Sequence, residues 1–546
     1  MKKTEICDKI KENIRCGELM VKLSIKLPLS YSREDIISEI LSALPVQRDE
    51  IRETAIVKRT LNLSDKSNIH YDAAVAFSAS PEREAGLLKM KKKVSEYPSY
   101  KLTLPEYKGK LRPVVVGAGP AGLFAALALA ESGACPILLE RGLDVDARGE
   151  RVKSFAHFGA LDPECNVQFG EGGAGTYSDG KLKVGSMDKY KMKVLSEFVL
   201  AGADEDIMYS ATAHVGTDKL PGIVKKIRNK ITALGGEVLF GRRLSEINIK
   251  DGKVASVVAK TADGEDAFEC DSLVLAAGHS ARDVFEILKN IGAALEPRGF
   301  GIGVRIEHPR EYINELVYGK NYPDILETAS YHLVTHLKNG RSVYSFCMCP
   351  GGTVVPAASE EGGIVTNGMS EYLRNGENSN AAFLVSVTPE DFGSDDPLSG
   401  IDFQRRIERN AYSLTGSYKA PSQSLASLKD GGASLPLVKS SYSVGTELHA
   451  VNEYLPDFVC SSLSESIADF DEWLPGFYYP GAAVTGPETR TTSPIRVLRD
   501  ESGESVTVKG LYPTGEGAGY SGGIVSSARD GIMVAEKILE KHKSEI

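Results

Sequence analysis

The sequence predicts an α/β fold, and three observations along its 546 residues support that prediction. Val114–Val116 is a run of β-branched residues, which is typical of a short buried strand. A Gly-x-Gly-x-x-Gly pattern follows, and then the strong helix formers of Leu123–Ala130. A second apolar run, Ile137–Leu139, ends in Glu140. Strand, glycine loop, helix and strand in this order form one Rossmann-like unit of a parallel sheet.

Each glycine of the pattern has its own expected role. Gly117 allows a tight turn, Gly119 lets the backbone approach a pyrophosphate, and Gly122 lets the helix pack closely on the strand. The phosphates then lie at a helix N-terminus, where free N–H groups favour negative charge. Glu140 follows Gly117 by 23 residues, a spacing that suits a carboxylate accepting both hydroxyls of an adenosine ribose. An ordinary βαβ turn with an exposed glutamate is the less favoured alternative.

Composition excludes several functional classes. The net charge of −10 disfavours broad binding to nucleic acid or anionic membranes, although residues 1–100 are mildly basic. The N-terminus lacks the apolar core of a signal peptide, and glycines interrupt the uncharged run from Pro113 to Ala130, so we expect a soluble cytoplasmic protein with no membrane span. The 8 cysteines include no Cys-x-x-Cys, which argues against a disulfide framework and a zinc ribbon, and we expect no metal site.

The first 95 residues predict a small α+β domain of the ferredoxin-like type. Met20–Leu27 alternates apolar and polar residues as a strand does, and Ser32 with Asp35 forms a capping box for the helix that follows. Two more strands, near Thr54–Leu63 and Ile69–Phe77, and a helix from Pro81 to about Lys93 complete the pattern. Residues 96–112, which include Pro98 and Pro105, are the expected linker.

Residues 113–294 are expected to form the first segment of the dinucleotide domain, 295–480 an inserted α+β domain that would bind substrate, and 481–546 the second segment. Asn166–Lys181 is so rich in glycine that it suits a loop lying against a flat or phosphorylated ligand, or a flexible surface loop. A β-meander with Asp-Gly turns leads to a buried strand that ends at Gly278. A second glycine pattern, Gly517–Gly522, has no strand or acid after it, so it is not a second dinucleotide unit.

Several long motifs carry a resemblance to a known family. They include RPVVVGAGPAGLFAALALAESG, NVQFGEGGAGTYSDGKL, PETRTTSPIRVLRD and GLYPTGEGAGYSGGIVSSARDGI, and they extend from about residue 112 to the C-terminus. The chain resembles the two-segment FAD domain of glutathione-reductase-like flavoproteins. More closely, it resembles the uncharacterised FAD-dependent dehydrogenase family, described as NAD(P)/FAD-dependent oxidoreductases. Cys165 stands where the family pattern has Ser, which weakens a catalytic role for that thiol.

The resemblance implies a set of FAD-binding residues. It assigns the pyrophosphate to the glycine loop, the adenosine ribose to Glu140, and adenine to the backbone of Val238. It also implies that the ribityl–phosphate end lies at Gly515 and Glu516, and that helix N–H groups at Gly522, Gly523 and Ile524 stabilise reduced flavin. The whole expected set is Gly117, Gly119, Pro120, Ala121, Gly122, Glu140, Arg141, Gly172, Gly173, Gly175, Val238, Gly278, Gly515, Glu516, Gly522, Gly523 and Ile524.

The sequence offers candidates for chemistry but does not choose among them. Cys347 and Cys349 form Cys-Met-Cys, either a redox pair or, by the narrowness of disulfide geometry, two buried structural thiols. Arg490 suits either an anionic substrate or the flavin edge, or else a structural salt bridge. His279 could act as an acid or base. Arg305, Glu307 and His308 are further polar candidates, expected at strand ends or in turns.

These observations predict an FAD-dependent oxidoreductase with non-covalent FAD and an unknown small-molecule substrate. The alternative is a flavin-bound binding or RNA-associated protein whose FAD is structural. NAD(P)H is expected only as a transient electron donor, because the chain has one dinucleotide unit. It would visit an open cleft between the FAD domain and residues 295–480, with Arg490 and the end of the Ala276–His279 strand near its mouth.

Overall fold

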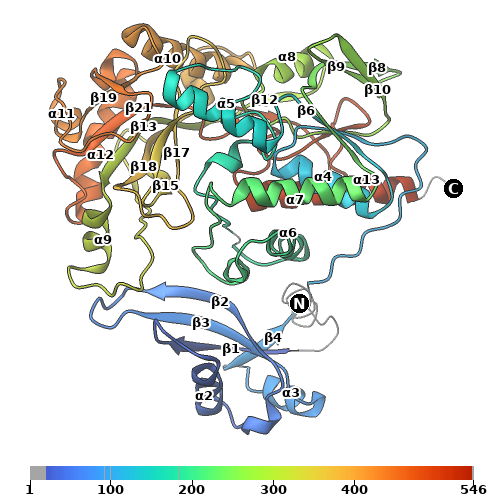
Figure 1. Ribbon diagram of the computed structural model, residues 1–546, viewed down its shortest axis with the longest axis vertical. Helices are drawn as coiled ribbons and strands as arrows, with labels where there is room; N and C mark the ends of the chain where they lie inside the picture. The colour runs from blue at the N-terminus through green and yellow to red at the C-terminus, as the bar shows by residue number, and fades with distance from the viewer. Residues whose placement is uncertain (1–19, 92, 99, 184, 544–546) are drawn as a thin grey trace. The chain divides into compact units, whose positions relative to one another are not determined.

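The structure is a computed structural model that describes residues 20–91, 93–98, 100–183 and 185–543 (Figure 1). The chain is a mixed α/β protein that divides into two compact units. The first unit holds the described residues up to Thr103 together with Leu182–His214 and Tyr318–Glu327. The second unit holds Leu104–Lys181, Val215–Val317 and the described residues from Thr328 onward. The break at Thr103 lies within the expected linker 96–112.

The first unit is built on a four-stranded antiparallel sheet. Its strands are β1 (Met20–Leu27), β2 (Thr54–Asn62), β3 (His70–Phe77) and β4 (Val94–Tyr97), in the order β2-β3-β1-β4. With α2 (Arg33–Ala43) and α3 (Pro81–Leu88), the chain order is βαββαβ, the ferredoxin-like pattern. Ser32 and Asp35 form the capping box of α2. The fourth strand was not expected, and it crosses the predicted boundary at residue 95.

Two later segments, Leu182–His214 and Tyr318–Glu327, also belong to the first unit. From the sequence, the former was expected in the dinucleotide domain and the latter in the inserted domain. α6 (Lys189–Leu200) and the 3₁₀ helix η3 (Glu205–Met208) lie in the first of them. The strand β2 explains their place: the Arg59 N–H donates to the Tyr209 carbonyl at 2.7 Å, and the Ala211 N–H donates to the Arg59 carbonyl at 2.9 Å. This pairing satisfies backbone groups on β2, which is an edge strand of the sheet.

The second unit contains a five-stranded parallel sheet. Its strands are β5 (Val114–Val116), β6 (Ile137–Glu140), β7 (Glu237–Phe240), β11 (Leu273–Leu275) and β23 (Leu511–Pro513), in the order β23-β11-β5-β6-β7. The helices α4 (Pro120–Glu131) and α13 (Ile524–Lys543) pack along each other (Figure 1). Gly531 makes this approach possible, because a Cβ there would overlap the backbone of Ala121. The α4 residues from Ala121 to Ala130 are all buried, as an apolar sequence requires.

The expected β-meander comprises β8 (Arg243–Lys250), β9 (Lys253–Lys260) and β10 (Glu265–Glu269). Its first turn has φ angles of 51° at Asp251 and 73° at Gly252. Positive φ at both central residues is the signature of a hairpin turn that favours Asp-Gly. The remaining helices of this region are α5 (Val145–Phe158), α7 (Leu220–Ala233) and α8 (Arg282–Asn290), with the 3₁₀ turn η2 (Ala174–Tyr177).

A seven-stranded sheet forms the rest of the second unit. Its order is β14-β15-β18-β13-β21-β19-β20, from β14 (Val334–His336), β15 (Ser342–Cys349), β18 (Asn378–Val387), β13 (Phe300–Pro309), β21 (Ala483–Glu488), β19 (Ala420–Ser424) and β20 (Thr446–Leu448). The main helices around it are α9 (Arg310–Tyr318), α10 (Ser399–Thr415), α11 (Leu425–Asp430) and α12 (Asp457–Trp473). Because β21 belongs to this sheet, the inserted region extends to Glu488 rather than ending at residue 480.

Two short pairs complete the second unit. β12 (Leu295–Pro297) pairs with β22 (Ile495–Val497), and β16 (Thr353–Pro356) pairs with β17 (Thr366–Met369). The β12–β22 pair joins the chain that enters the seven-stranded sheet to the chain that leaves it. Within the residues that the structure describes, no helix is both long and apolar enough to cross a membrane.

Candidate functional site

The glycine loop after β5 lies at the carboxyl edge of the parallel sheet, where several backbones meet. Gly117 has a φ of 99°, and a Cβ there would overlap the carbonyl of Ala276 at the end of β11. A Cβ on Gly122 would overlap the Gly117 carbonyl, and one on Gly515 would lie 2.7 Å from the Ala121 Cβ. We call these three glycines the glycine cradle. The geometry agrees with the turn expected at Gly117 and the close packing expected at Gly122, while the expected contact of Gly515 with the ribityl–phosphate end stays a prediction.

The N-terminus of α4 points its free backbone groups at the same edge. Gly119 is the N-cap residue, with φ −74° and ψ −179°, and no side chain caps the helix. The uncapped N–H groups of the first turn are the groups that bind phosphate oxygens in proteins. A Cβ on Gly119 would meet only the Cα of Gly173, at 3.8 Å. The cradle therefore fits the pyrophosphate of a dinucleotide.

Glu140 is the last residue of β6 and lies beside this cradle. Its carboxylate accepts hydrogen bonds from backbone N–H groups of three different loops. It accepts the N–H of Ala118 at 2.8 Å, and those of Gly142 and Gly170 at 2.9 Å each. The residue is 5% exposed. A carboxylate offers about four acceptor positions, so three backbone bonds leave one for a ribose hydroxyl. The double contact to a ribose stays a prediction, and the structure adds a loop-positioning role.

The glycine-rich loop is folded around a single arginine that the sequence analysis missed. Arg148 on α5 is fully buried and donates to the carbonyls of Asn166, Val167, Gly170 and Glu171. Burial lowers the pKa of this guanidinium. Because a Cβ on Gly170 would lie within the side chain of Arg148, the loop needs glycine there. The loop is thus an ordered part of the fold rather than a flexible surface segment.

Arg141 and the other expected cofactor residues occupy the same edge of the sheet. The Arg141 guanidinium contacts Glu164 at 2.9 Å and Asp283 at 3.0 Å, and lies 4.2 Å from the Phe169 ring centroid. Gly278 has a φ of 75° and lies in contact range of Gly517, whose Cβ would come within 2.6 Å of the Gly278 carbonyl. Val238, the residue expected at adenine, lies in β7. Cys165, for which a catalytic role was not favoured, is a buried thiol whose pKa is raised by burial. The contacts of the expected cofactor residues with FAD remain predictions.

His279 and Glu516 come together from the loops after β11 and β23. The His279 Nε2 lies 4.0 Å from a Glu516 carboxylate oxygen. Burial, followed by the positive charges of Arg490 and Arg282, lowers the pKa of His279 to about 3. Burial raises the pKa of Glu516 to about 7, while Arg298 opposes that rise. At neutral pH the imidazole is therefore uncharged, and the pair is not an ion pair.

Arg490 lies in a buried ion-pair network, which we call the arginine network. Its Nη2 lies 3.0 Å from a Glu408 carboxylate oxygen, and its Nη1 donates to Ser359. Arg282 contacts the same carboxylate at 2.8 Å, and both Arg282 and Glu408 are almost fully buried. Of the two interpretations of Arg490 from the sequence, this geometry favours the structural salt bridge. Burial alone would raise the pKa of Glu408, but the two guanidiniums hold it well below its usual range.

The two cysteines of the Cys-Met-Cys motif are free thiols on β15, where a β-bulge interrupts the pairing with β18. Cys347 is exposed and has a φ of 39°, an uncommon conformation for a residue with a side chain. Burial raises the pKa of the Cys349 thiol. The Cys349 thiol donates to the Cys347 carbonyl at 3.3 Å. Cys349 is therefore not poised to be a nucleophilic thiolate.

Glu307 and His308 are among the last three residues of β13, which agrees with the expected strand end, whereas Arg305 lies inside the strand rather than at its end or in a turn. All three are fully buried within β13, a strand in the middle of the seven-stranded sheet. Arg305 pairs with Glu488, with one contact of 2.8 Å, and His308 bonds the Phe477 carbonyl at 3.0 Å. Glu307 accepts from Asn378, Ser440 and Ser441. Except for the His308 Nδ1, which is buried without a hydrogen-bond partner among the described residues, their side chains form interior hydrogen bonds, which favours a structural role.

A recess of about 430 Å³ lies between the seven-stranded sheet and the loop before α13. We call it the arginine recess. Its lining residues are Arg298, Tyr344, Phe346, Thr491, Thr492, Arg496, Gly519, Tyr520, Ser521 and Gly522. Neither Arg490 nor the end of the Ala276–His279 strand lines it, and the cleft expected beside those residues stays a prediction. Gly522, at the start of α13, is shared between this recess and the expected flavin site.

Comparisons with known proteins agree with this geometry. A family described as "FAD-dependent protein, C-terminal domain-like" matches residues 299–491. An uncharacterised protein of Clostridium beijerinckii is 46% identical over 528 residues, covering 95% of this chain and 98% of the relative. The fold and site define an FAD-dependent protein. More narrowly, the chain belongs to the uncharacterised family of FAD-dependent proteins that its sequence motifs indicate.

Solved structures show more distant likeness. The flavin-dependent brominase Bmp2 matches with 11% identity and a TM-score of 0.36, over 80% of each chain. The open form of a flavocytochrome c3 fumarate reductase matches with 12% identity and a TM-score of 0.33, over 80% of this chain and 79% of the other. Likeness of this degree does not establish a shared activity.

Proposed function

We propose that this protein is an oxidoreductase that holds FAD non-covalently and exchanges two electrons with a small-molecule substrate. The observation that carries the proposal is the glycine cradle beside the uncapped start of α4. A Cβ on Gly117 or Gly122 would overlap neighbouring backbone, and one on Gly515 would lie 2.7 Å from the Ala121 Cβ, so no side chain fits at these positions. An ordered backbone edge with free N–H groups suits a pyrophosphate, and the membership of an FAD-dependent family supports FAD as the ligand.

The residues expected to hold FAD come from three loops of the same edge. The cradle and the α4 start would bind the pyrophosphate, while Glu140 would use its remaining acceptor position on the ribose. The loop of Gly172, Gly173 and Gly175 would cover the cofactor, held in place by Arg148. When bound, FAD supplies the capacity to take up or release an electron pair, which no protein side chain here supplies.

His279 and Glu516 are the side chains best suited to hold or move a proton. A carboxyl group with a pKa of about 7 is close to half protonated at neutral pH, which is the condition for general acid or base catalysis. His279, kept neutral, can accept a hydrogen bond from the protonated carboxyl of Glu516 or donate one to the carboxylate. We assign the proton-handling role to Glu516 and the positioning role to His279.

Reduced nicotinamide would be a transient electron donor. Only the Gly117–Gly122 pattern has the strand, helix and acid that a dinucleotide site requires, and FAD would use it. Donors therefore have to reach the flavin from an open face. Rapid-mixing reduction at increasing NADPH should give a rate that rises without saturating in the micromolar range; saturation there would contradict this part of the proposal.

Gly119→Ala tests the cofactor site without disturbing the fold. The backbone of Gly119 has an extended conformation that alanine adopts freely, and the new methyl would meet only Gly173 at an ordinary contact distance. The methyl would nevertheless keep a pyrophosphate away from the backbone. We expect unchanged apoprotein stability and FAD affinity at least about tenfold weaker, which corresponds to about 1.4 kcal/mol.

The two hypotheses, an oxidoreductase and a binding or RNA-associated protein with structural FAD, predict different reactivity of the bound flavin. The purified protein should be yellow, release FAD on acid precipitation, and be reduced anaerobically by a nicotinamide or by a metabolite from a panel. A colourless protein that FAD does not reconstitute would contradict the cofactor assignment. A flavin that no physiological donor reduces and no substrate reoxidises would instead favour a binding or RNA-associated protein with structural FAD.

A further inference from the structure

The arginine recess contains two cations brought together by strand pairing. β12 and β22 pair so that Glu296 lies opposite Arg496, and Arg298 follows the end of β12 by one residue. Both guanidiniums donate to the same carbonyl, that of Gly519, at 3.2 Å from Arg298 and 3.5 Å from Arg496. Two positive charges thus share one neutral oxygen.

Neither guanidinium is neutralised within the part of the chain that the structure describes. No carboxylate there forms an ion pair with either arginine. The Arg496 guanidinium lies 5.5 Å from the Tyr520 ring centroid, and its Nε is buried without a hydrogen-bond partner. Burial, and then the charge of Arg496, lowers the pKa of Arg298, while Glu516 acts in the opposite direction. Both arginines are half-buried, and a buried donor such as the Arg496 Nε is costly when it has no partner, so an anion that enters the recess would stabilise the pair.

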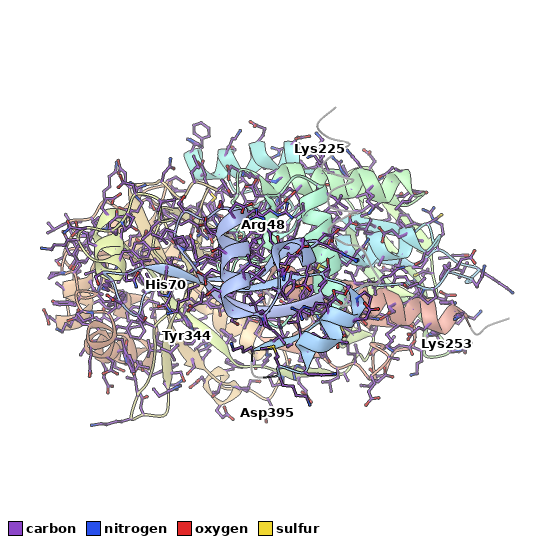
Figure 2. The ribbon with its side chains drawn as sticks, turned by 90° about the horizontal axis from the view of Figure 1, so that it is seen from below. Arg48, His70, Lys225, Lys253, Tyr344 and Asp395 are labelled. Atoms are coloured by element: carbon purple, nitrogen blue, oxygen red, sulfur yellow. The ribbon has the colours of Figure 1, made fainter. Side chains whose placement is uncertain are left out.

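The walls of the recess are aromatic. Tyr344 and Phe346 point to the same side of β15, with ring centroids 6.5 Å apart and planes at 89°. Tyr344 is labelled among the side chains in Figure 2. Tyr520 lines the recess from the loop before α13, and its hydroxyl accepts the N–H of Arg499 at 3.1 Å. These rings, fixed by their neighbours, favour a flat or apolar ligand body.

We propose that the arginine recess binds an organic acid, with its carboxylate between Arg298 and Arg496 and its flat or apolar body against the aromatic walls. A guanidinium fork matches the planar geometry of a carboxylate, which is why arginine is favoured at such sites. The volume of about 430 Å³ is large enough for an aromatic or medium-chain acid. The description of this acid as the substrate rests on the proposed function, whereas its binding does not.

The place of the recess fits a substrate. Gly519 and Gly522 line it, and Gly522 precedes the first residue of α13, the helix whose N-terminus is expected at the flavin. Glu516, the proposed proton carrier, acts electrostatically on Arg298 and lies three residues before Gly519. An acid bound by the two arginines would therefore lie beside both the expected flavin and a group able to exchange its proton.

Binding of simple acids to the FAD-loaded protein tests the proposal. Benzoate, phenylacetate and hexanoate would be titrated by calorimetry and by the absorbance of the flavin, each against its neutral amide. We expect the acids to bind at least about tenfold more tightly than the amides. Arg298→Gln and Arg496→Gln should each weaken binding of the acids at least about tenfold and leave binding of the amides unchanged.

Arg151→Gln is the matched control, because Arg151 is an exposed arginine on α5, far along the chain from the recess residues. It should bind the acids as the unaltered protein does. Equal binding of acids and amides would overturn the proposal even if the protein carries redox-active FAD. Loss of FAD from either glutamine variant would also overturn it, since the recess would then belong to the cofactor. Absence of FAD from the unaltered protein would contradict the proposed function instead, and acid binding would then be measured by calorimetry alone.

Discussion

The carboxylate of Glu140 offers the sharpest test of how the cofactor edge is held together. Glu140→Ala removes the acceptor of three backbone N–H groups, from Ala118, Gly142 and Gly170. Hydrogen bonds to charged groups contribute roughly 1.5–3 kcal/mol each, and donors left buried without partners add a desolvation cost. Even with partial rescue by water, we expect the free energy of unfolding of the apoprotein to fall by about 3 kcal/mol or more.

The FAD affinity should fall in the same variant, by at least about tenfold, because the ribose contact and the loop positions are lost together. Urea denaturation of the apoprotein and an FAD titration at a temperature below its unfolding separate the two effects. Glu150→Ala is the control, since Glu150 is exposed on α5 and pairs only with Lys153 nearby. If the apoprotein of Glu140→Ala were as stable as the control and bound FAD normally, both the loop-positioning role and the ribose assignment would be refuted.

Three further predictions follow from buried groups. Glu408→Gln removes the carboxylate that Arg282 and Arg490 share and leaves Glu360, which contacts Arg282 at 2.5 Å, as the nearest negative charge; the free energy of unfolding should fall by about 3–5 kcal/mol in urea melts. Gly531→Ala should destabilise the α4–α13 contact and lower the melting temperature, whereas Gly222→Ala, in open space on α7, should leave it equal or slightly higher. Glu516→Gln should make the stability of the apoprotein less dependent on pH. Because the pKa of Glu516 is raised to about 7 in the folded protein, its contribution to stability is greatest below the ordinary pKa of about 4.5 and is lost as the pH rises from about 4.5 to about 7. The unaltered protein should therefore lose stability over this interval in urea melts, and the variant should not.

Local patterns allowed much of the fold to be predicted. The β5–α4–β6 unit, the Asp-Gly turn of the meander and the capping box of α2 depend on residues close in sequence, and the structure has all three. The strand β4 was not predicted because only one of its four residues, Val94, has a buried apolar side chain. Its place is fixed by pairing with β1, which is information that the short segment does not contain.

The buried polar residues were harder to predict, for a physical reason. A strand covered on both faces buries every side chain, so Arg305, Glu307 and His308 in β13 are interior, although their residue types suggested strand ends or turns. Arg148 looks like a surface residue of a polar helix, and only the path of the glycine-rich loop gives its donors four carbonyls. Such residues are specified by tertiary partners rather than by local pattern.

The distribution of charge around the proposed flavin edge follows from the same principle. In the arginine network, Glu408 opposes both Arg282 and Arg490, so these two guanidiniums are satisfied internally and leave little capacity for a ligand. In the arginine recess, Arg298 and Arg496 share a carbonyl and Arg496 also lies 5.5 Å from the Tyr520 ring centroid, but within the described residues neither has a carboxylate in ion-pair contact. Both pairs bring together residues about 200 positions apart, and sequence singled out only Arg490. The difference between a structural arginine and a ligand-binding one is therefore whether the fold provides a carboxylate, and by that criterion an anion belongs between Arg298 and Arg496.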